Sequence, residues 1–347
     1  MLTALSCASS APSAPEDPAR PSLGELPPTP EIAEALLTRV AAIYQGHAAA
    51  STPAGTGTLT WKGLWDDTSV DARAEFHPGP AWAIAVTGGL LTSAEMTTDA
   101  FAAIICHETG HLVGGFPFKG RPIESIATMG TVSAAEAQSD YFATQDCLPR
   151  LWADDTAANA AAFAALDAAQ RARCTAAFGD LASQQICARS LLAAVQMGRW
   201  LVSRNPGNAY PQLDTPDTSA VQITRYDGYP SLQCRVDTLV AGAQCSVKHT
   251  GTVIPGLMAP YGEFSYPSEA AARPFACQSG PGARPRCWFQ PDGVWTDCSA
   301  LGPSACVVAD GQDAVRLCSA NFGVEIGPCS EGTVCKSDES GAYCDFP

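Results

Sequence analysis

The stretch Cys106-His107-Glu108-Thr109-Gly110-His111 decides which fold we expect for this chain of 347 residues. Histidines four residues apart on a helix lie about one turn from each other on the same face, with the glutamate beside that face. Both imidazoles can then bind one metal ion, and this spacing is typical of zinc sites. The alternative is an ordinary helix that contains two histidines by chance.

The residues next to the histidines also fit a metal-binding helix. Gly110 leaves the face beside the metal uncrowded, and Gly114-Gly115 supplies the glycines at which many helices end. Cys106 directly precedes His107, but its direction around the helix differs by about 100°. We therefore expect Cys106 to be a core or disulfide thiol and not a ligand.

A catalytic zinc needs a third protein ligand and an open position for water. Glu136 is the candidate, and Asp140 follows it by one helical turn. A ligand carboxylate and a second carboxylate that holds a ligating histidine would have this arrangement. The alternative is a capping box, in which Ser133 and Glu136 only bind the first amides of a helix. The spacing alone leaves both interpretations open.

His-Glu-x-x-His followed by Glu-x-Gln-x-Asp resembles the gluzincin family that includes the HtpX heat-shock protease, the CAAX prenyl proteases and the soluble periplasmic protease BepA. The resemblance extends over about residues 31 to 250, with strong motifs and loose similarity between them. It implies that Glu136 is the third zinc ligand and that Asp140 supports a zinc-binding histidine. It also implies that Glu108 takes the proton of a zinc-bound water and passes it to the leaving amine.

Two further segments resemble parts of the same family. One is similar to the edge strand that pairs with the substrate backbone in zincins, and it consists of Trp82, Ala83, Ile84, Ala85 and Val86. The other, Tyr229-Pro-Ser-Leu-Gln-Cys-Arg235, is similar to the closing His-Pro-x-x-x-x-Arg segment, with tyrosine in place of histidine. The resemblance makes Tyr229 and Arg235 the candidate catalytic donors to the oxyanion. The tyrosine leaves open whether both residues are structural.

Residues 31–255 have the composition and the patterns of an α+β domain. Apolar residues make up 46% of the chain and charged residues 16%, which favours a globular fold. Apolar residues at helical spacing predict helices at 31–47, 97–113, 133–147, 156–173 and 181–204, and short apolar or alternating runs between 58 and 86 predict strands. We expect a zincin-like metallopeptidase domain, mainly helical, with a small sheet whose edge strand precedes the metal helix.

The 15 cysteines are typical of a protein in an oxidising compartment. Cys7 precedes a tether rich in Ala, Ser and Pro and resembles the acylated cysteine of a bacterial lipoprotein, although six residues are too short for the signal segment. We interpret residues 1–30 as a truncated leader and tether. We expect a secreted or periplasmic protein held at a membrane only through a lipid on Cys7. The alternative is a disordered tail with a chance cysteine.

The C-terminal part is rich in Gly, Pro and Cys, and we divide it into a connector at 256–299 and a disulfide-rich module at 300–347. The segment Cys329-Ser-Glu-Gly-Thr-Val-Cys335 and the closing Cys344 resemble the small chitin-binding modules of some fungal chitinases. The resemblance implies a glycan partner for this module. The alternative is a disulfide-stapled cap or spacer, because no aromatic platform is evident.

These observations predict a zinc-dependent endopeptidase with one catalytic Zn2+ and a protein or peptide substrate outside the cytoplasm. The net charge of −15 and the lack of a Lys/Arg cluster argue against nucleic acid as a partner. A zinc amidase that cleaves cell-wall peptides and a non-catalytic, glycan-binding surface lipoprotein are the alternatives. His77 and His249 lack a partner at ligand spacing, and we expect both on the surface.

Overall fold

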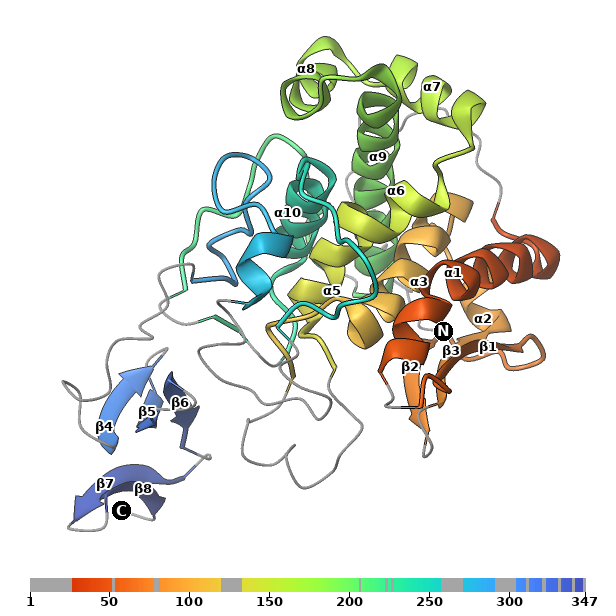
Figure 1. Ribbon diagram of the computed structural model, residues 1–347. Helices are drawn as coiled ribbons and strands as arrows, with labels where there is room; N and C mark the ends of the chain where they lie inside the picture. The colour runs from red at the N-terminus through yellow and green to blue at the C-terminus, as the bar shows by residue number, and fades with distance from the viewer. Residues whose placement is uncertain are drawn as a thin grey trace, which may run out of the picture.

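The computed structural model describes most of the chain between residues 27 and 345, with gaps. The described ranges are 27–51, 54–77, 81–119, 133–205, 207–221, 224–225, 228–256, 271–290, 304–309, 312–319, 323–329, 332–338 and 341–345. These residues form a mixed structure of helices and small sheets, as the α+β prediction requires (Figure 1). Cys7 and nearly all of the expected tether lie outside the described residues.

The first helix and a small sheet make up the N-terminal part of the fold. Helix α1 (Pro30–Ala50) begins after Thr29, whose side chain accepts a hydrogen bond from the Ile32 amide. Three strands follow, β1 (Thr58–Leu64), β2 (Ala72–His77) and β3 (Ala81–Thr87). They form one sheet in the order β1-β3-β2, in which β3 is parallel to β1 and antiparallel to β2.

The strand order corrects the prediction that Trp82, Ala83, Ile84, Ala85 and Val86 form the edge strand. These residues lie in β3, which is the central strand, and Trp82 is paired with Leu59 on one side and with Phe76 on the other. A strand that is paired on both sides cannot add a substrate strand. All five side chains are buried, and such a continuous apolar run is the pattern of a strand that is covered on both faces of the sheet. The edge next to the metal helix is β2.

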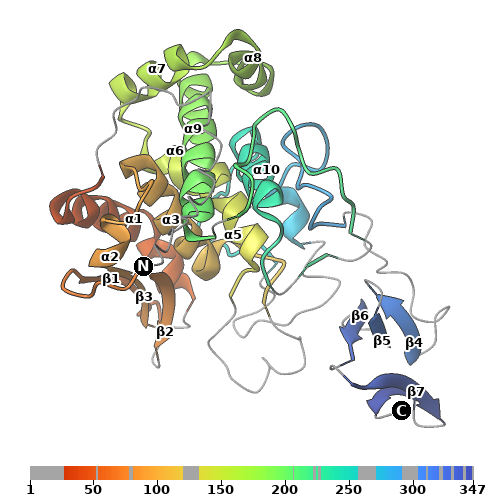
Figure 2. The ribbon, with the colours of Figure 1, turned by 180° about the vertical axis from the view of Figure 1, so that it is seen from behind.

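Helices form the rest of the larger body. They are α2 (Gly88–Leu91), α3 (Thr98–Val113), α5 (Glu136–Phe142), the π-helical turn η1 (Ala143–Cys147), α6 (Leu148–Leu151), α7 (Thr156–Ala165), α8 (Ala168–Ala177), α9 (Leu181–Arg204), α10 (Leu232–Ala243) and the 3-10 turn η2 (Arg273–Phe275). The helix expected at 156–173 is two helices, because Asp167 begins α8 with a capping box. Helix α10 had no counterpart in the prediction. It packs beside α9 and α5 (Figure 2).

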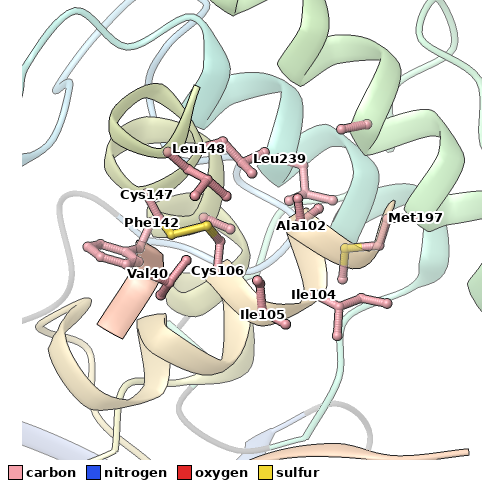
Figure 3. Packing of buried hydrophobic residues seen from close by; sticks show 14 of the residues in the cluster. Val40, Ala102, Ile104, Ile105, Cys106, Phe142, Cys147, Leu148, Met197 and Leu239 are labelled. Carbon is pink, nitrogen blue, oxygen red and sulfur yellow. A yellow bond between two sulfur atoms is a disulfide. The ribbon is translucent and has the colours of Figure 1, made fainter. Parts of the chain in front are cut away.

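Helix α3, which contains both histidines of the motif, lies at the centre of the core. Every residue from Asp99 to Val113 is buried. Figure 3 shows Ile104 and Ile105 among apolar side chains from α1, α5, α6, α9 and α10. Cys106 forms a disulfide with Cys147 at the end of η1, as expected for a core thiol. This bond joins α3 to η1, and its α3 cysteine directly precedes His107.

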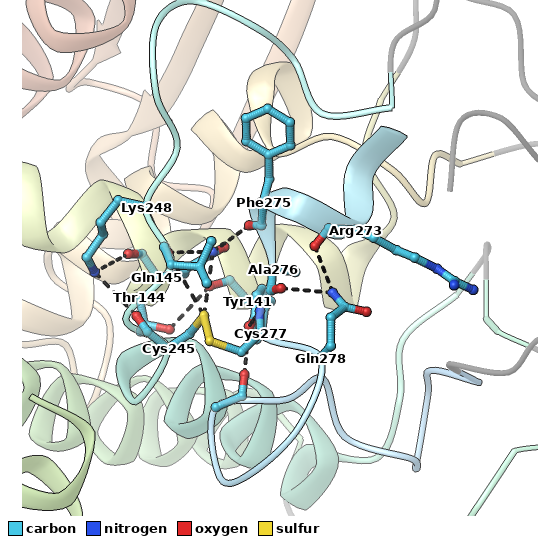
Figure 4. The surroundings of a disulfide bond; sticks show 12 residues. Tyr141, Thr144, Gln145, Cys245, Lys248, Arg273, Phe275, Ala276, Cys277 and Gln278 are labelled. Carbon is cyan, nitrogen blue, oxygen red and sulfur yellow. Dashed lines mark hydrogen bonds between the residues drawn. A yellow bond between two sulfur atoms is a disulfide. The ribbon is translucent and has the colours of Figure 1, made fainter. Parts of the chain in front are cut away.

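Disulfides also attach part of the expected connector to the helical body. Cys234–Cys287 and Cys245–Cys277 join residues 271–290 to α10 and to the segment that follows it. Around the second bond, the Gln145 amide donates to the Phe275 carbonyl at 2.6 Å (Figure 4). The Tyr141 hydroxyl donates to the Gly282 carbonyl at 2.7 Å. Residues 271–290 therefore support α5, which begins with the third expected ligand, Glu136, and η1, which follows α5.

Two small antiparallel sheets form the described C-terminal part, in agreement with the expected disulfide-rich module. They consist of β4 (Ser304–Ala309), β5 (Gln312–Ser319) and β6 (Gly323–Pro328), and of β7 (Val334–Asp338) and β8 (Gly341–Asp345). Cys306–Cys335 joins β4 to β7, and Cys329–Cys344 joins the end of β6 to β8. Cys174–Cys187, between α8 and α9, completes the six described disulfides. Among the described helices, none has the length and hydrophobicity to span a bilayer.

His249 is buried, so its predicted surface position was wrong. Its ring lies between the rings of Phe142 and Phe275, at centroid distances of 5.4 and 5.7 Å. The Nδ1 atom has no hydrogen-bond partner among the described residues. Burial lowers the pKa of His249 to about 4, against a smaller opposing effect of Asp146. His77 is exposed, as predicted.

His249 should make the fold less stable in acid. Its folded-state pKa lies below the unfolded value of about 6.5, so stability is complete above that pH and falls as the pH drops toward 4, by about 3 kcal/mol. In His249→Phe, the loss of unfolding free energy between pH 7 and pH 4 should be smaller by this amount. Urea unfolding at both pH values measures it, with His77→Gln as the control. Equal acid losses in wild type and His249→Phe would contradict the assignment.

Candidate metal centre

His107 and His111 direct their Nε2 atoms to the same point. Their ring centroids lie 4.7 Å apart on α3, and both side chains are buried. The Nδ1 of His107 lies 2.7 Å from Asp140 Oδ1, and the Nδ1 of His111 lies 2.8 Å from the Ala134 carbonyl oxygen. Because both partners are acceptors, Nδ1 carries the proton in each ring. The Nε2 atoms of the neutral rings are therefore unprotonated and available to a metal.

Glu136 brings a third lone pair to this point. Its Oε2 atom lies 3.1 Å from His107 Nε2 and 3.6 Å from His111 Nε2, and it makes no hydrogen bond within the described structure. Glu136 is the first residue of α5, Ala135 is the N-cap residue, and no side chain caps this end. The capping-box alternative for Ser133 and Glu136 is therefore wrong. The ligand atoms of His107, His111 and Glu136 all lie within 4.8 Å of one another.

The charges around this point favour a cation. Burial lowers the pKa of His107, but Asp140 and Glu136 outweigh it and raise the pKa to about 9. Burial raises the pKa of Glu136, but the two histidines outweigh it and hold the pKa well below its usual range. In the metal-free chain, His107 is therefore protonated at neutral pH, and its positive charge occupies the place that a metal cation would take. Two imidazoles and one carboxylate with an open fourth position are a donor set that fits catalytic zinc.

Gly110 and Ser139 allow the two ligand-bearing helices to approach closely. A Cβ atom at Gly110 would lie 2.8 Å from the Ser139 Cα atom, which is closer than side-chain carbons pack. The Ser139 hydroxyl oxygen lies 2.9 Å from His111 Nδ1. It can therefore be the second acceptor in a three-centre hydrogen bond from the Nδ1 proton, together with the Ala134 carbonyl oxygen. The small residues at this crossing therefore place Glu136 beside the histidines.

Arg235 was predicted as a candidate catalytic donor to the oxyanion, but the partner of its guanidinium in the structure is Asp140. Its guanidinium is buried and donates from Nε to Asp140 Oδ2 at 2.8 Å and from Nη2 to Asp140 Oδ1 at 2.9 Å. Both nitrogens are committed to a carboxylate that also binds His107. Arg235 is therefore a positioning residue, which acts on the centre through Asp140.

Tyr229 lies beside the centre, on the same side as Arg235. The Arg235 guanidinium carbon is 4.9 Å from the centroid of the Tyr229 ring. Partial burial and the charge of Glu136 raise the pKa of Tyr229 to about 12, although much of the side chain is exposed. Tyr229 thus stays protonated at neutral pH and remains a candidate donor.

Glu108 lies between the two histidines in sequence and contacts the sheet edge. Its Oε2 atom accepts a hydrogen bond of 2.8 Å from the Ala74 amide in β2. Burial raises the pKa of Glu108, against the lowering effect of the two histidines. A carboxylate with a raised pKa, held by one oxygen, is suited to accept a proton near neutral pH.

Sequence reasoning missed two residues of the centre, Ala74 and Lys119. Lys119 Nζ lies 2.5 Å from Glu136 Oε1. The run that forms β2 lies within the region where strands were expected, and its half-buried alternation could have identified it. Lys119 has no such signal, because it reaches Glu136 through the bridge between Phe118 and Ala134, which are 16 residues apart in sequence.

The third ligand and its helix partner should differ in their effect on metal binding. Glu136→Ala removes a ligand and should weaken Zn2+ binding more than about 100-fold, whereas Asp140→Asn should cost about 10- to 100-fold, as outer partners typically do. Competition with a chromophoric chelator measures both affinities. Glu34→Ala, which removes a carboxylate bonded to the Trp65 indole, is the matched control. Unchanged affinity in Glu136→Ala would show that Glu136 is not a ligand.

Comparison with known proteins gives no family for this chain. No protein-family model matches it, and neither a curated protein nor a solved structure matches it. The likeness to gluzincins therefore rests on the His107, Glu108, His111, Glu136 and Asp140 side chains. A proposal for the function must therefore be argued from the geometry of these residues.

Proposed function

We propose that this chain is a zinc-dependent endopeptidase of the gluzincin type, which hydrolyses peptide bonds of proteins outside the cytoplasm. The observation that supports it most strongly is the convergence of two imidazole Nε2 atoms and one carboxylate oxygen of Glu136 beside a separate buried carboxylate, Glu108. A metal site alone needs only the first three groups. The fourth supplies the base that hydrolysis requires.

The residues of the chain divide the chemistry between them. When bound, zinc would polarise the scissile carbonyl and acidify the attacking water. Glu108 is held at Oε2 by the Ala74 amide, so its Oε1 atom is the one that takes the proton of the attacking water. The same carboxyl group then passes this proton to the leaving amine. Tyr229 is the proposed donor to the oxyanion, because partial burial and the nearby charge of Glu136 keep its hydroxyl protonated at neutral pH.

The free edge of β2 is the proposed binding place for the substrate backbone. Asp71 pairs with Thr87, since its carbonyl accepts from the Thr87 amide at 3.1 Å. The alternation of an antiparallel ladder then turns the amides and carbonyls of Ala72, Ala74 and Phe76 away from β3. The Ala74 amide meets Glu108 on that side. An extended peptide added to this edge would therefore lie beside the base and the metal ligands.

Other features agree with this proposal. The disulfides are typical of proteins in an oxidising compartment outside the cytoplasm. A glycan-binding lipoprotein without turnover would not need a buried base fixed by the sheet edge. A zinc amidase would use the same residues, and only its substrate, a cell-wall peptide, distinguishes it from an endopeptidase.

Glu108→Gln should keep the metal and lose hydrolysis. The amide has nearly the shape of the carboxylate but cannot take a proton, so kcat should fall by at least about 100-fold. Release of peptides from casein is the assay, run with and without a chelator and after Zn2+ is added back. Glu34→Gln is the control, and peptidoglycan is the second substrate.

Two results would contradict the proposal. One is casein cleavage that resists the chelator, and the other is Glu108→Gln with wild-type kcat. Chelator-sensitive release of peptide fragments from peptidoglycan alone would instead identify the amidase.

A further inference from the structure

A short ribbon fixes Lys119 in front of the third ligand. The Lys119 amide donates to the Ser133 carbonyl at 2.6 Å, and the Ala135 amide donates to the Pro117 carbonyl at 2.8 Å. Between them, Phe118 and Ala134 form an antiparallel bridge. The residue after Ala135 is Glu136, so the backbones of Lys119 and of the ligand are held at a fixed separation.

The two oxygens of Glu136 face two different positive groups. Oε1 lies 2.5 Å from Lys119 Nζ, whereas Oε2 lies among the histidine nitrogens at the metal position. The Glu136 side chain is buried, and the Lys119 side chain is about one-third exposed. The ammonium therefore restrains one oxygen and leaves the other to bind the metal.

The Lys119 ammonium adds one positive charge beside the proposed metal ligands. We count Zn2+, the neutral imidazoles, Glu136 and Lys119 alone, since Asp140 is paired with Arg235 and the charge of Glu108 does not depend on Lys119. The carboxylate of Glu136 and the ammonium of Lys119 then cancel, so these groups with a bound Zn2+ would carry a net charge of two. Without Lys119 the net charge would be one. A carboxylate that shares its charge with an ammonium attracts a metal less, and the ammonium itself repels the metal. The same positive charge stabilises the negative charge that develops on the substrate oxygen.

We propose that Lys119 is a positioning residue that acts through Glu136. It holds the carboxylate with one oxygen toward the metal, and it keeps the charge of the centre high, which favours catalysis and weakens metal binding. The inference rests on the proposed function, but its effect on metal affinity does not depend on turnover.

Lys119→Met and Lys119→Arg test the role of the charge. Lys119→Met keeps the length of the side chain and should bind Zn2+ more tightly, by about tenfold or more, because the repulsion is removed. Its kcat should fall about 10- to 100-fold with little change in KM, because charge stabilisation is lost from the transition state. Lys119→Arg should keep both quantities within about threefold of wild type. Chelator competition and casein hydrolysis are the measurements, with Lys62→Met as the surface control.

The opposite directions of the two effects identify the mechanism. A merely structural Lys119 would give lower affinity and lower kcat together in Lys119→Met, and this result would overturn the inference. So would wild-type values of both quantities. Tighter Zn2+ binding by Lys119→Met in a chain that does not cleave casein would support the inference while the proposed endopeptidase function fails. Lack of Zn2+ binding by the wild-type chain would overturn both.

Discussion

The Asp140 carboxylate is the contact on which the rest of the centre depends. It is fully buried in α5, receives two hydrogen bonds from Arg235 in α10 and binds the Nδ1 atom of His107 in α3. Removing one partner of a buried carboxylate leaves an uncompensated charge and strongly destabilises the fold. The contacts of Asp140 therefore hold α3, α5 and α10 together. Because Asp140 also fixes the tautomer of His107, the same contact that stabilises the fold directs Nε2 toward the proposed metal position.

Other constraints bring the remaining groups to this point. The Cys106–Cys147 disulfide joins α3 to η1, and the absence of a side chain at Gly110 lets α5 approach α3. The sheet reaches the centre through the Ala74 amide, which restrains Glu108. Glu136 contacts Lys119 through Oε1 and His107 through Oε2. The proposed metal ligands and the proposed base are thus each held by a neighbour on a different element.

The part of this arrangement that depends on helical spacing could be predicted from sequence. One turn of helix separates His107 from His111 and Glu136 from Asp140, but only the resemblance to gluzincins implies that Glu136 is the third ligand. The strand order could not be predicted, because a buried apolar run such as Trp82–Val86 does not tell whether a strand is central or at an edge. Arg235 was misassigned for a similar reason, since its partner Asp140 lies 95 residues away. Burial of His249 likewise arises from packing between α5 and a segment near residue 275.

The central claim is that His107, His111 and Glu136 together bind one zinc ion. X-ray absorption at the zinc edge of the Zn2+-loaded protein tests it most directly, because it reports the ligand atoms and their distances. The structure predicts one zinc per chain with two imidazole nitrogens and oxygen ligands at about 2.0 to 2.2 Å, without sulfur. Sulfur at about 2.3 Å, or a shell without imidazole, would contradict the account.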